Sequence, residues 1–220
     1  MTADEVRRAS TPRGELVLRR RPDGHQELRA NGVFVMDTLE HTSERALAAR
    51  ALALHEGARL RVLVGGLGLG YTLGEVLADP RVERCTVVEI EPDLVDWLRE
   101  GVVPHAAPLL ADPRTRVLVA DVADAIRDLA AGSQDLLLLD VDNGPAHLVH
   151  EGNARLYDEA GLRELGRVLS PGGVAAVWSA SPSPALEAAM RAVFGAVEAV
   201  EVPAPGHGRV GSYLLYAGRA

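Results

Sequence analysis

Apolar residues along the chain fall into short continuous runs, and longer stretches with apolar residues at helical spacing separate these runs. The runs predict strands near 61–65, 84–89, 116–119, 135–140 and 173–179, and the stretches predict helices near 70–79, 92–100, 121–131, 154–168 and 183–194. The leucines at 136–139 show no polar alternation, which indicates a strand that is buried on both faces. Strands of this kind predict a parallel sheet that is covered by helices.

The beginning of the chain carries β patterns of a different kind. Residues 14–38 contain short alternating segments that are separated by turn sequences at 22–24 and 31–32. They predict a small antiparallel meander. We therefore expect a short N-terminal β appendage over residues 1–40 and one larger domain over residues 41–220.

The larger domain is predicted to begin with a helix and to end with a pair of strands. Thr42 or Ser43 can cap a helix that continues through residues 44–54. The segments 196–202 and 212–217, which residues 203–208 separate, predict a terminal antiparallel pair. The expected fold is therefore α/β, with a doubly wound, Rossmann-like, mostly parallel seven-stranded sheet.

A glycine-rich turn follows the strand that is predicted near residues 61–65 and opens the next helix. Its glycines are Gly66, Gly68 and Gly70, in the pattern G-x-G-x-G. A dinucleotide site needs glycine or alanine at a third position, where this chain has Tyr71 or, in the other register, Leu73. The pattern is instead typical of S-adenosylmethionine-dependent transferases.

Acidic residues follow the predicted strands. Glu89 ends the second strand, where the acid of a nucleotide site would bind ribose hydroxyls. Asp121 follows the third strand, and Asp140 ends the fourth, with Asp142 close behind it. Ligands of such sheets collect at the carboxyl ends of the strands, so these acids are candidate site residues. The alternative for each is a helix N-cap, and this alternative is weakest for Asp140 because a loop follows it.

Composition narrows the class of partner. The formal charge is −8, from 23 Lys and Arg against 31 Asp and Glu, and the arginines are scattered. This charge disfavours nucleic acid and suits a small-molecule amine. Cys85 lies in an apolar segment and is expected in the core. Without an apolar run of membrane-spanning length or a signal-peptide core, the chain is expected to be cytoplasmic, with no membrane partner. No metal is expected.

Five segments resemble the spermidine synthase family in order and spacing, over about residues 30–218. They are VLVGGLGLGYTLGEVL, VVEIEPDLV, Asp121, QDLLLLDVDNGP and LYDEAGLRELGRVLSPGGV. The resemblance implies a class I methyltransferase fold that binds S-adenosylmethionine or its decarboxylated form. The residues implied in donor binding are Gly66, Leu67, Gly68, Gly70, Glu89, Ile90, Asp121, Val122 and Asp140. By position, Glu89 would bind the ribose hydroxyls, Asp121 the adenine amino group, and Asp140 the acceptor amine.

The chain departs from that family at the donor loop and at the first helix. Leu69 stands where aminopropyltransferases have an acid that binds the aminopropyl amine. The family's Tyr-His-Glu in the first helix is Thr42-Ser43-Glu44, which keeps the glutamate. Losing an acid partner of a buried ammonium group costs several kcal/mol, which disfavours a donor that depends on it.

The expected reaction is nucleophilic displacement at a carbon next to a sulfonium, with an amine as the acceptor. Asp140, with Asp142 beside it, could hold the ammonium form and accept its proton. Tyr157 stands where the family has an aromatic residue after the loop, and plain packing is the alternative. His147 and His150 are either bases or solvated loop residues, and Trp178 is either a pocket or a core residue. The predicted catalytic residues are Asp140, Asp142 and Tyr157.

Three functions remain open on these residues. The first is methyl transfer from S-adenosylmethionine to a small amine or polar acceptor, which Leu69 favours. The second is aminopropyl transfer from the decarboxylated donor, which Asp140 and the family pattern favour. The third is a non-catalytic nucleoside-binding protein. The strand edges of the two β segments could also pair in a homodimer.

Overall fold

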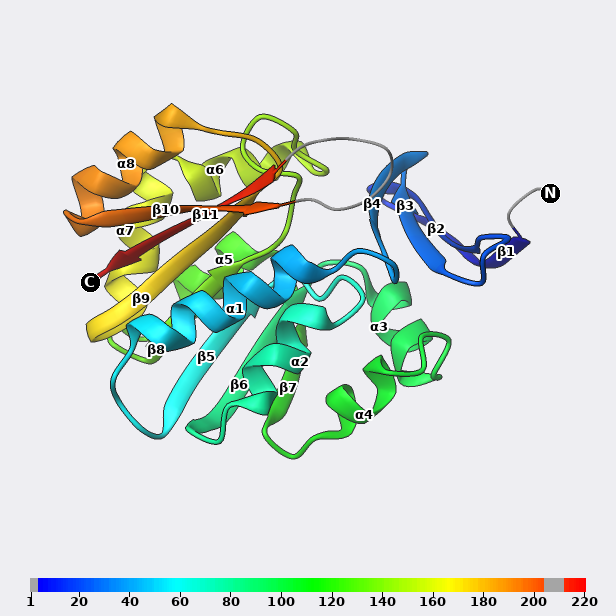
Figure 1. Cartoon of the computed structure of the whole chain (residues 1–220), viewed down its shortest axis with the longest axis horizontal. Helices are drawn as coiled ribbons and strands as arrows, with labels where there is room; N and C mark the ends of the chain where they lie inside the picture. The colour runs from blue at the N-terminus through cyan, green and yellow to red at the C-terminus, as the bar shows by residue number, and fades with distance from the viewer. Residues whose placement is uncertain (1–3, 204–211) are drawn as a thin grey trace.

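The computed structural model describes residues 4–203 and 212–220, which form a small and a large sheet (Figure 1). The small sheet is an antiparallel meander in chain order, as predicted. Its strands are β1 (Asp4–Thr11), β2 (Gly14–Arg20), β3 (Gln26–Ala30) and β4 (Val33–Asp37). Strand β1 was not predicted. Its residues are polar except Val6 and Ala9, and it is the edge strand next to β2, so its sequence shows no regular hydrophobic alternation.

The large sheet contains seven strands in the order β10-β11-β9-β8-β5-β6-β7. They are β5 (Leu60–Gly65), β6 (Val82–Glu89), β7 (Thr115–Val119), β8 (Gln134–Leu139), β9 (Leu169–Ser179), β10 (Val197–Pro203) and β11 (Ser212–Arg219). Strand β11 runs antiparallel to β9 and β10, and the pairs among β5–β9 are parallel. The predicted doubly wound sheet and its terminal antiparallel pair are confirmed. Residues 204–208 of the predicted connection lie outside the described residues.

Helices cover both faces of this sheet (Figure 1). One face packs against α1 (Thr42–Leu54), α2 (Tyr71–Ala78), α3 (Pro92–Arg99) and α4 (Ala106–Ala111). The other packs against α5 (Val122–Asp128), α6 (Ala154–Tyr157), α7 (Glu159–Val168) and α8 (Pro184–Phe194), and η1 (Glu151–Asn153) precedes α6. Successive residues of a strand alternate between the two cores, since Val62 and Val64 belong to one and Leu63 to the other.

Three helix predictions need correction. The helix expected over 154–168 is interrupted, because the Asp158 side chain accepts a hydrogen bond from Gly161 N at 2.8 Å and starts a new helix, α7. Helix α1 is preceded by His41, and neither Thr42 nor Ser43 caps it; the Ser43 hydroxyl donates to the Glu44 carboxylate at 2.8 Å. Helix α5 ends at residue 128, before the predicted end at 131, and the short α4 was not predicted.

The carboxyl ends of the central strands lie next to the meander. Strands β5 and β8 are neighbours, and the chain leads from β5 to β6 on one side and from β8 to β9 on the other, which opens a crevice at their carboxyl ends. The glycine-rich turn between β5 and α2 lies at this crevice. None of the helices within the described ranges combines the length and the apolar character of a membrane-spanning helix.

Candidate active site

A cavity of about 1410 Å³ lies between the meander and the carboxyl ends of β5, β6 and β8. Leu16, Leu28 and Met36 of the meander form an apolar part of its wall, and Gly66 and Gly68 form part of the opposite wall. Pockets for a single small ligand typically measure about 300–1,000 Å³. This cavity therefore has room for two ligands at once.

The glycine-rich turn has a backbone that side chains would not tolerate. Gly66 and Gly68 have φ angles of +92° and +50°. A Cβ atom on Gly66 would overlap the backbone carbonyl oxygen of Asp140, and one on Gly68 would lie 2.6 Å from the Met36 sulfur. Gly70 precedes α2 with φ +90°. The glycines therefore let the turn approach the end of β8 closely, and contact of the turn with a donor stays a prediction.

The Glu89 carboxylate fastens the glycine-rich turn to the end of β6. Its Oε2 accepts a hydrogen bond from Leu67 N at 2.9 Å, and its Oε1 accepts one from Glu91 N at 2.9 Å. The side chain lines the cavity and is 7% exposed, and burial raises its pKa. Each carboxylate oxygen can accept a further hydrogen bond, which leaves Glu89 able to bind a ligand diol.

An ion pair joins the meander to the same end of β6. Arg13 Nε and Nη2 lie 2.7 and 2.9 Å from the Glu91 carboxylate oxygens. Arg13 Nη2 also donates to the Ile90 carbonyl oxygen at 2.9 Å. All three residues line the cavity, so the meander is held where it can cover a donor. Sequence reasoning missed Arg13, because no motif links positions so far apart in the chain.

Asp121 is a helix N-cap, which was the alternative to a binding role for this residue. Its side chain caps α5 by accepting from Ala123 N at 2.8 Å, and it pairs with Arg155 at 2.7 Å. Within the described part of the chain, the cavity lining includes the next residue, Val122, and not Asp121. Contact between Asp121 and an adenine amino group therefore stays a prediction.

Two further acidic side chains line the cavity: Asp140, which directly follows β8, and Glu44 of α1. Asp140 Oδ2 accepts a hydrogen bond from the Thr72 hydroxyl at 2.6 Å. Burial raises the pKa of Asp140 to about 6, against the effect of that hydrogen bond. Burial, with Asp140 as the next cause, raises the pKa of Glu44 to about 7. Both carboxyl groups therefore titrate closer to neutral pH than ordinary Asp and Glu side chains do.

Aromatic side chains lie beside this carboxylate pair. The rings of Trp178 and Tyr213 are 5.1 Å apart, and both residues line the cavity. Burial raises the pKa of Tyr213, and Glu44 and Glu40 raise it further, which indicates negative charge near its ring. Trp178 thus has both of the roles that were considered, since it lines the cavity and is 8% exposed within the core.

The loop after β8 supplies the outer wall. His147 and His150, together with Asn143, line the cavity. Asp142 accepts a hydrogen bond from the Tyr157 hydroxyl at 3.0 Å, and burial raises the pKa of both groups. Asp142 also lines the cavity, whereas Tyr157 belongs to the core below it.

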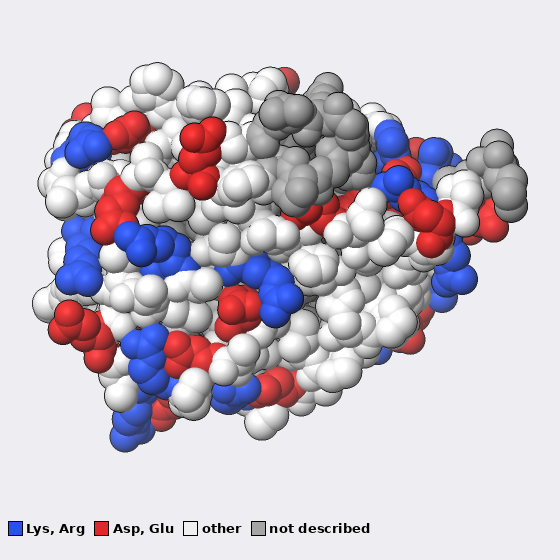
Figure 2. Space-filling model, in the orientation of Figure 1, with Lys and Arg blue, Asp and Glu red and all other residues white. Residues whose placement is uncertain are grey.

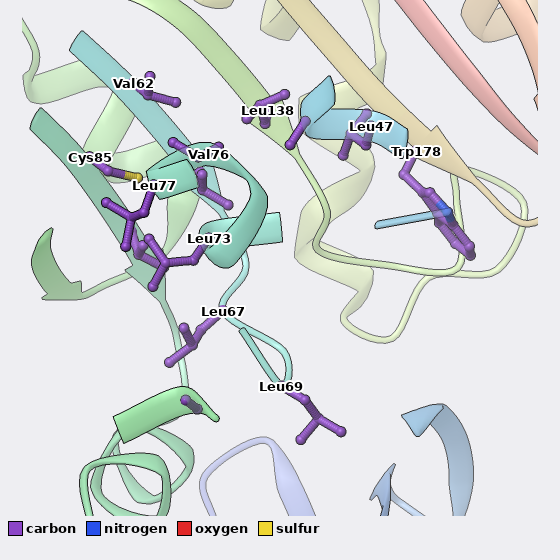
Figure 3. Close-up of a cluster of buried hydrophobic side chains, with 14 of the residues drawn as sticks. Leu47, Val62, Leu67, Leu69, Leu73, Val76, Leu77, Cys85, Leu138 and Trp178 are labelled. Carbon is purple, nitrogen blue, oxygen red and sulfur yellow. The ribbon is translucent and has the colours of Figure 1, made fainter. Parts of the chain in front are cut away.

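Leu69 is fully buried and contributes to the core around α2. Its N–H lies 3.2 Å from the Met36 sulfur, and its carbonyl oxygen lies 2.8 Å from His105 Nε2. Figure 3 shows Leu67 and Leu69 on the glycine-rich turn that leads into α2, with Leu67 on the side of Leu73. The turn therefore brings no carboxylate of its own to the cavity.

Charge on the outer surface is mixed. Figure 2 shows Arg, Asp and Glu side chains interleaved over the face in view, which matches the many Arg–carboxylate pairs. The cavity differs, because the buried Glu44 and Glu89 and the half-buried Asp140 have no arginine partner in the described part of the chain. No cluster suited to a metal ion occurs among the described residues.

Comparisons with known proteins agree with this geometry. A family model described as the spermine/spermidine synthase domain matches residues 40–193. The chain is 32% identical over 153 residues to the polyamine aminopropyltransferase of Aeropyrum pernix, which covers 64% of this chain and 46% of that protein. It is 32% identical over 116 residues to putrescine N-methyltransferase 3 of Nicotiana tabacum, which covers 52% of this chain and 28% of that protein. The chain thus spans less than half the length of either relative.

The fold also matches solved structures. A spermidine synthase in complex with the transition state analogue AdoDATO superposes with a TM-score of 0.84 at 19% identity, over 98% of this chain and 73% of that one. At this identity the likeness establishes the fold alone. It confirms the predicted sheet architecture, the meander included.

Proposed function

The chain belongs to the spermine/spermidine synthase family, and from that premise we propose that it transfers a methyl group from S-adenosylmethionine to a small amine. The observation that carries the proposal is the pairing of two features in one cavity. A glycine-rich turn with Glu89 offers hydrogen bonds to a nucleoside, and Asp140 with Glu44 offers buried negative charge to an amine. The N-methyltransferase of Nicotiana tabacum, by its name, acts on putrescine, which is an amine of this kind.

The donor would lie between the turn and the meander. Gly66 and Gly68 allow close backbone approach, Glu89 can accept hydrogen bonds from ribose hydroxyls, and Ile90 and Val122 line the neighbouring wall. When bound, the donor would supply a methyl carbon on a sulfonium; as the amine nitrogen forms its bond to that carbon, the C–S bond breaks and S-adenosylhomocysteine leaves as the neutral thioether. The residues of this chain contribute alignment and exclusion of water.

The acceptor would lie beside Asp140. An amine arrives mainly as an ammonium ion and has to lose a proton before its lone pair can form the new N–C bond. The ionised Asp140 carboxylate can accept that proton, and the Thr72 hydroxyl holds the carboxylate at 2.6 Å. Glu44 provides a second acidic group for the proton or for the positive charge.

Aminopropyl transfer is the second candidate. The acidic pair favours it, because a decarboxylated donor brings a free ammonium group and no carboxylate. The Aeropyrum pernix relative is named as a polyamine aminopropyltransferase. Leu69 favours the methyl donor, since an apolar side chain stands at the position of the family's acid. Exchanging Leu69 for Asp would not decide the matter cleanly, because the site is fully buried and an unpaired carboxylate there would destabilise the fold.

Calorimetric titration with S-adenosylmethionine and, separately, with its decarboxylated form tests the proposal. Tighter binding of S-adenosylmethionine is expected for methyl transfer. Preference for the decarboxylated donor would favour aminopropyl transfer. Binding of neither ligand would contradict both and favour a protein that has kept the fold without this chemistry.

A further inference from the structure

The loop between β8 and η1 forms one wall of the cavity at the acceptor side. Asn143, His147, Leu148, Val149 and His150 all line the cavity. Loops of this kind have few hydrogen bonds of their own, so their shape depends on anchors outside them.

The first anchor lies at the beginning of the loop. Gly144 has φ +90° and packs so closely on β9 that a Cβ atom would overlap the Ser179 hydroxyl. Beside it, Ala180 N donates to the Asn143 carbonyl oxygen at 3.2 Å. These contacts place the first residues of the loop on the end of β9.

The second anchor is Asp142, which is 7% exposed. Its Oδ1 accepts hydrogen bonds from Val149 N at 2.7 Å and His150 N at 3.3 Å. Its Oδ2 accepts one from the Tyr157 hydroxyl at 3.0 Å, and the Asn153 side chain also donates to the carboxylate. One carboxylate therefore closes the far end of the loop and joins it to α6.

The Tyr157 ring supports this anchor from the core. It is 7% exposed and packs in the apolar layer under the sheet, so its hydroxyl is directed by the fold and not by the loop. Both oxygens of Asp142 already have donors within the protein. Asp140, in contrast, has one side-chain donor among the described residues, the hydroxyl of Thr72.

We infer that Asp142 and Tyr157 are positioning residues that hold the loop over residues 143–150 as a preformed wall of the acceptor side, while Asp140 has the direct contact with the acceptor. The inference rests on the proposed function. It differs from the sequence-based prediction that Asp142 and Tyr157 are catalytic, which stays untested. The loop then does not have to become ordered when the acceptor binds, which lowers the entropic cost of binding.

Three variants separate positioning from proton transfer. Asp142→Ala removes the hydrogen bonds that Asp142 accepts from Val149 N and His150 N, and putrescine, as the probe, should bind protein saturated with S-adenosylhomocysteine about tenfold more weakly. Asp142→Asn keeps an oxygen that can accept from Val149 N, so it should recover most of the acceptor affinity that Asp142→Ala loses. Tyr157→Phe removes one bond and should raise the KM for putrescine with little change in kcat. Affinity for S-adenosylhomocysteine should be unchanged in all three.

Tyr216→Phe is the matched control. The Tyr216 hydroxyl is buried and accepts a hydrogen bond from Ser183 N at 2.8 Å, at the start of α8 and away from the acceptor wall. Hydrogen exchange of loop amides 147–150 should quicken in Asp142→Ala and Tyr157→Phe and not in this control. This measurement needs no substrate, so it judges the anchor even if the parent protein binds neither putrescine nor a donor, which would count against the proposed function alone.

Two results would overturn the inference. One is loop exchange in Asp142→Ala and Tyr157→Phe that equals the exchange in the parent protein. The other is an Asp142→Asn variant as inactive as Asp142→Ala but with unchanged acceptor affinity, which would assign Asp142 to the chemistry. If Asp142→Ala does not fold, Tyr157→Phe and Asp142→Asn still decide.

Discussion

The donor half and the acceptor half of the cavity are built on different physical grounds. On the donor side, backbone conformation sets the shape, and both Glu89 oxygens are fastened to main-chain N–H groups. On the acceptor side, Asp140 and Glu44 are held in a buried setting that raises the pKa of each. Near them the Trp178 indole nitrogen is buried and finds no acceptor among the described residues.

This difference suits the two sides of the cavity to two different ligands. A nucleoside binds by shape and by directed hydrogen bonds, so a rigid cradle with satisfied partners serves it well. An amine brings charge that must be stabilised and then lost as a proton, so it needs carboxylates that are close to their titration point. Substitutions on the two sides should therefore change different quantities.

The largest effect is expected from Asp140→Asn. Loss of the proton acceptor should lower kcat by about 10²–10⁴-fold, while donor affinity stays nearly unchanged. Steady-state kinetics with putrescine and calorimetry with the donor would measure the two quantities. Asp112→Asn is a suitable control, because that carboxylate pairs with Arg114 outside the cavity lining. Equal losses of turnover and donor affinity would contradict the assignment of Asp140 to the acceptor side.

On the donor side, Gly66→Ala should destabilise the fold by about 2–5 kcal/mol, from its positive φ and from overlap with the Asp140 carbonyl oxygen. Gly101→Ala is the matched control, since φ is +76° and no atom lies within 4 Å of its added Cβ. That variant should cost about 1 kcal/mol. Chemical denaturation measures both, and equal costs would mean that close approach of the turn to β8 is not required.

A smaller effect is expected from Glu89→Ala. It should weaken binding of S-adenosylmethionine by about 1–3 kcal/mol, because charge-assisted hydrogen bonds to the ribose are lost. The turn also loses its bond between Leu67 N and Glu89. Calorimetry with the variant measures the change. Unchanged affinity would move the donor site elsewhere.

The smallest effect is a pH dependence of stability. The folded-state pKa values of Asp140 and Glu44 lie near 6 and 7, above ordinary values of 3.8 and 4.5, so the folded state binds these protons more tightly than the unfolded state does. The pair therefore stabilises the ligand-free protein below about pH 4, and this contribution is lost as the pH rises through 6 to 7.

Thermal denaturation from pH 4 to 8 would measure this loss as a falling Tm. Turnover should rise over the same upper range, because Asp140 has to be ionised to accept a proton. Glu44→Gln should flatten the stability profile. A Tm profile with the same slope in that variant would contradict the assignment to this pair.

Much of the fold could be predicted, because its signals are local. The leucines of β8 have no polar alternation, and a strand buried on both faces leaves that trace in any parallel sheet. Strand β1 and the helix interruption at Asp158 were not predicted, because neither leaves a distinct hydrophobic pattern in the sequence. An edge strand with two polar faces has no hydrophobic period, and a cap within an amphipathic stretch does not change the period around it.

Some residues of the candidate site could likewise be predicted from local sequence, and others could not. Gly66, Glu89 and Asp140 could be named because glycine turns and acids at strand ends have fixed places along the chain. Arg13, Thr72 and the anchoring bonds of Asp142 could not be found, since each partner lies on a distant element.

The sequence by itself determined the order of strands and helices, the family and the residues at the ends of the central strands, because hydrophobic period and motif spacing are properties of the chain. Only the tertiary structure decided which of those residues act together. It placed Glu44 of α1 in the same cavity as Asp140, which follows β8, buried Leu69 in the core and bonded Asp142 to the loop after β8. Burial and distance set charge and hydrogen bonding, and these quantities exist only once the chain has packed.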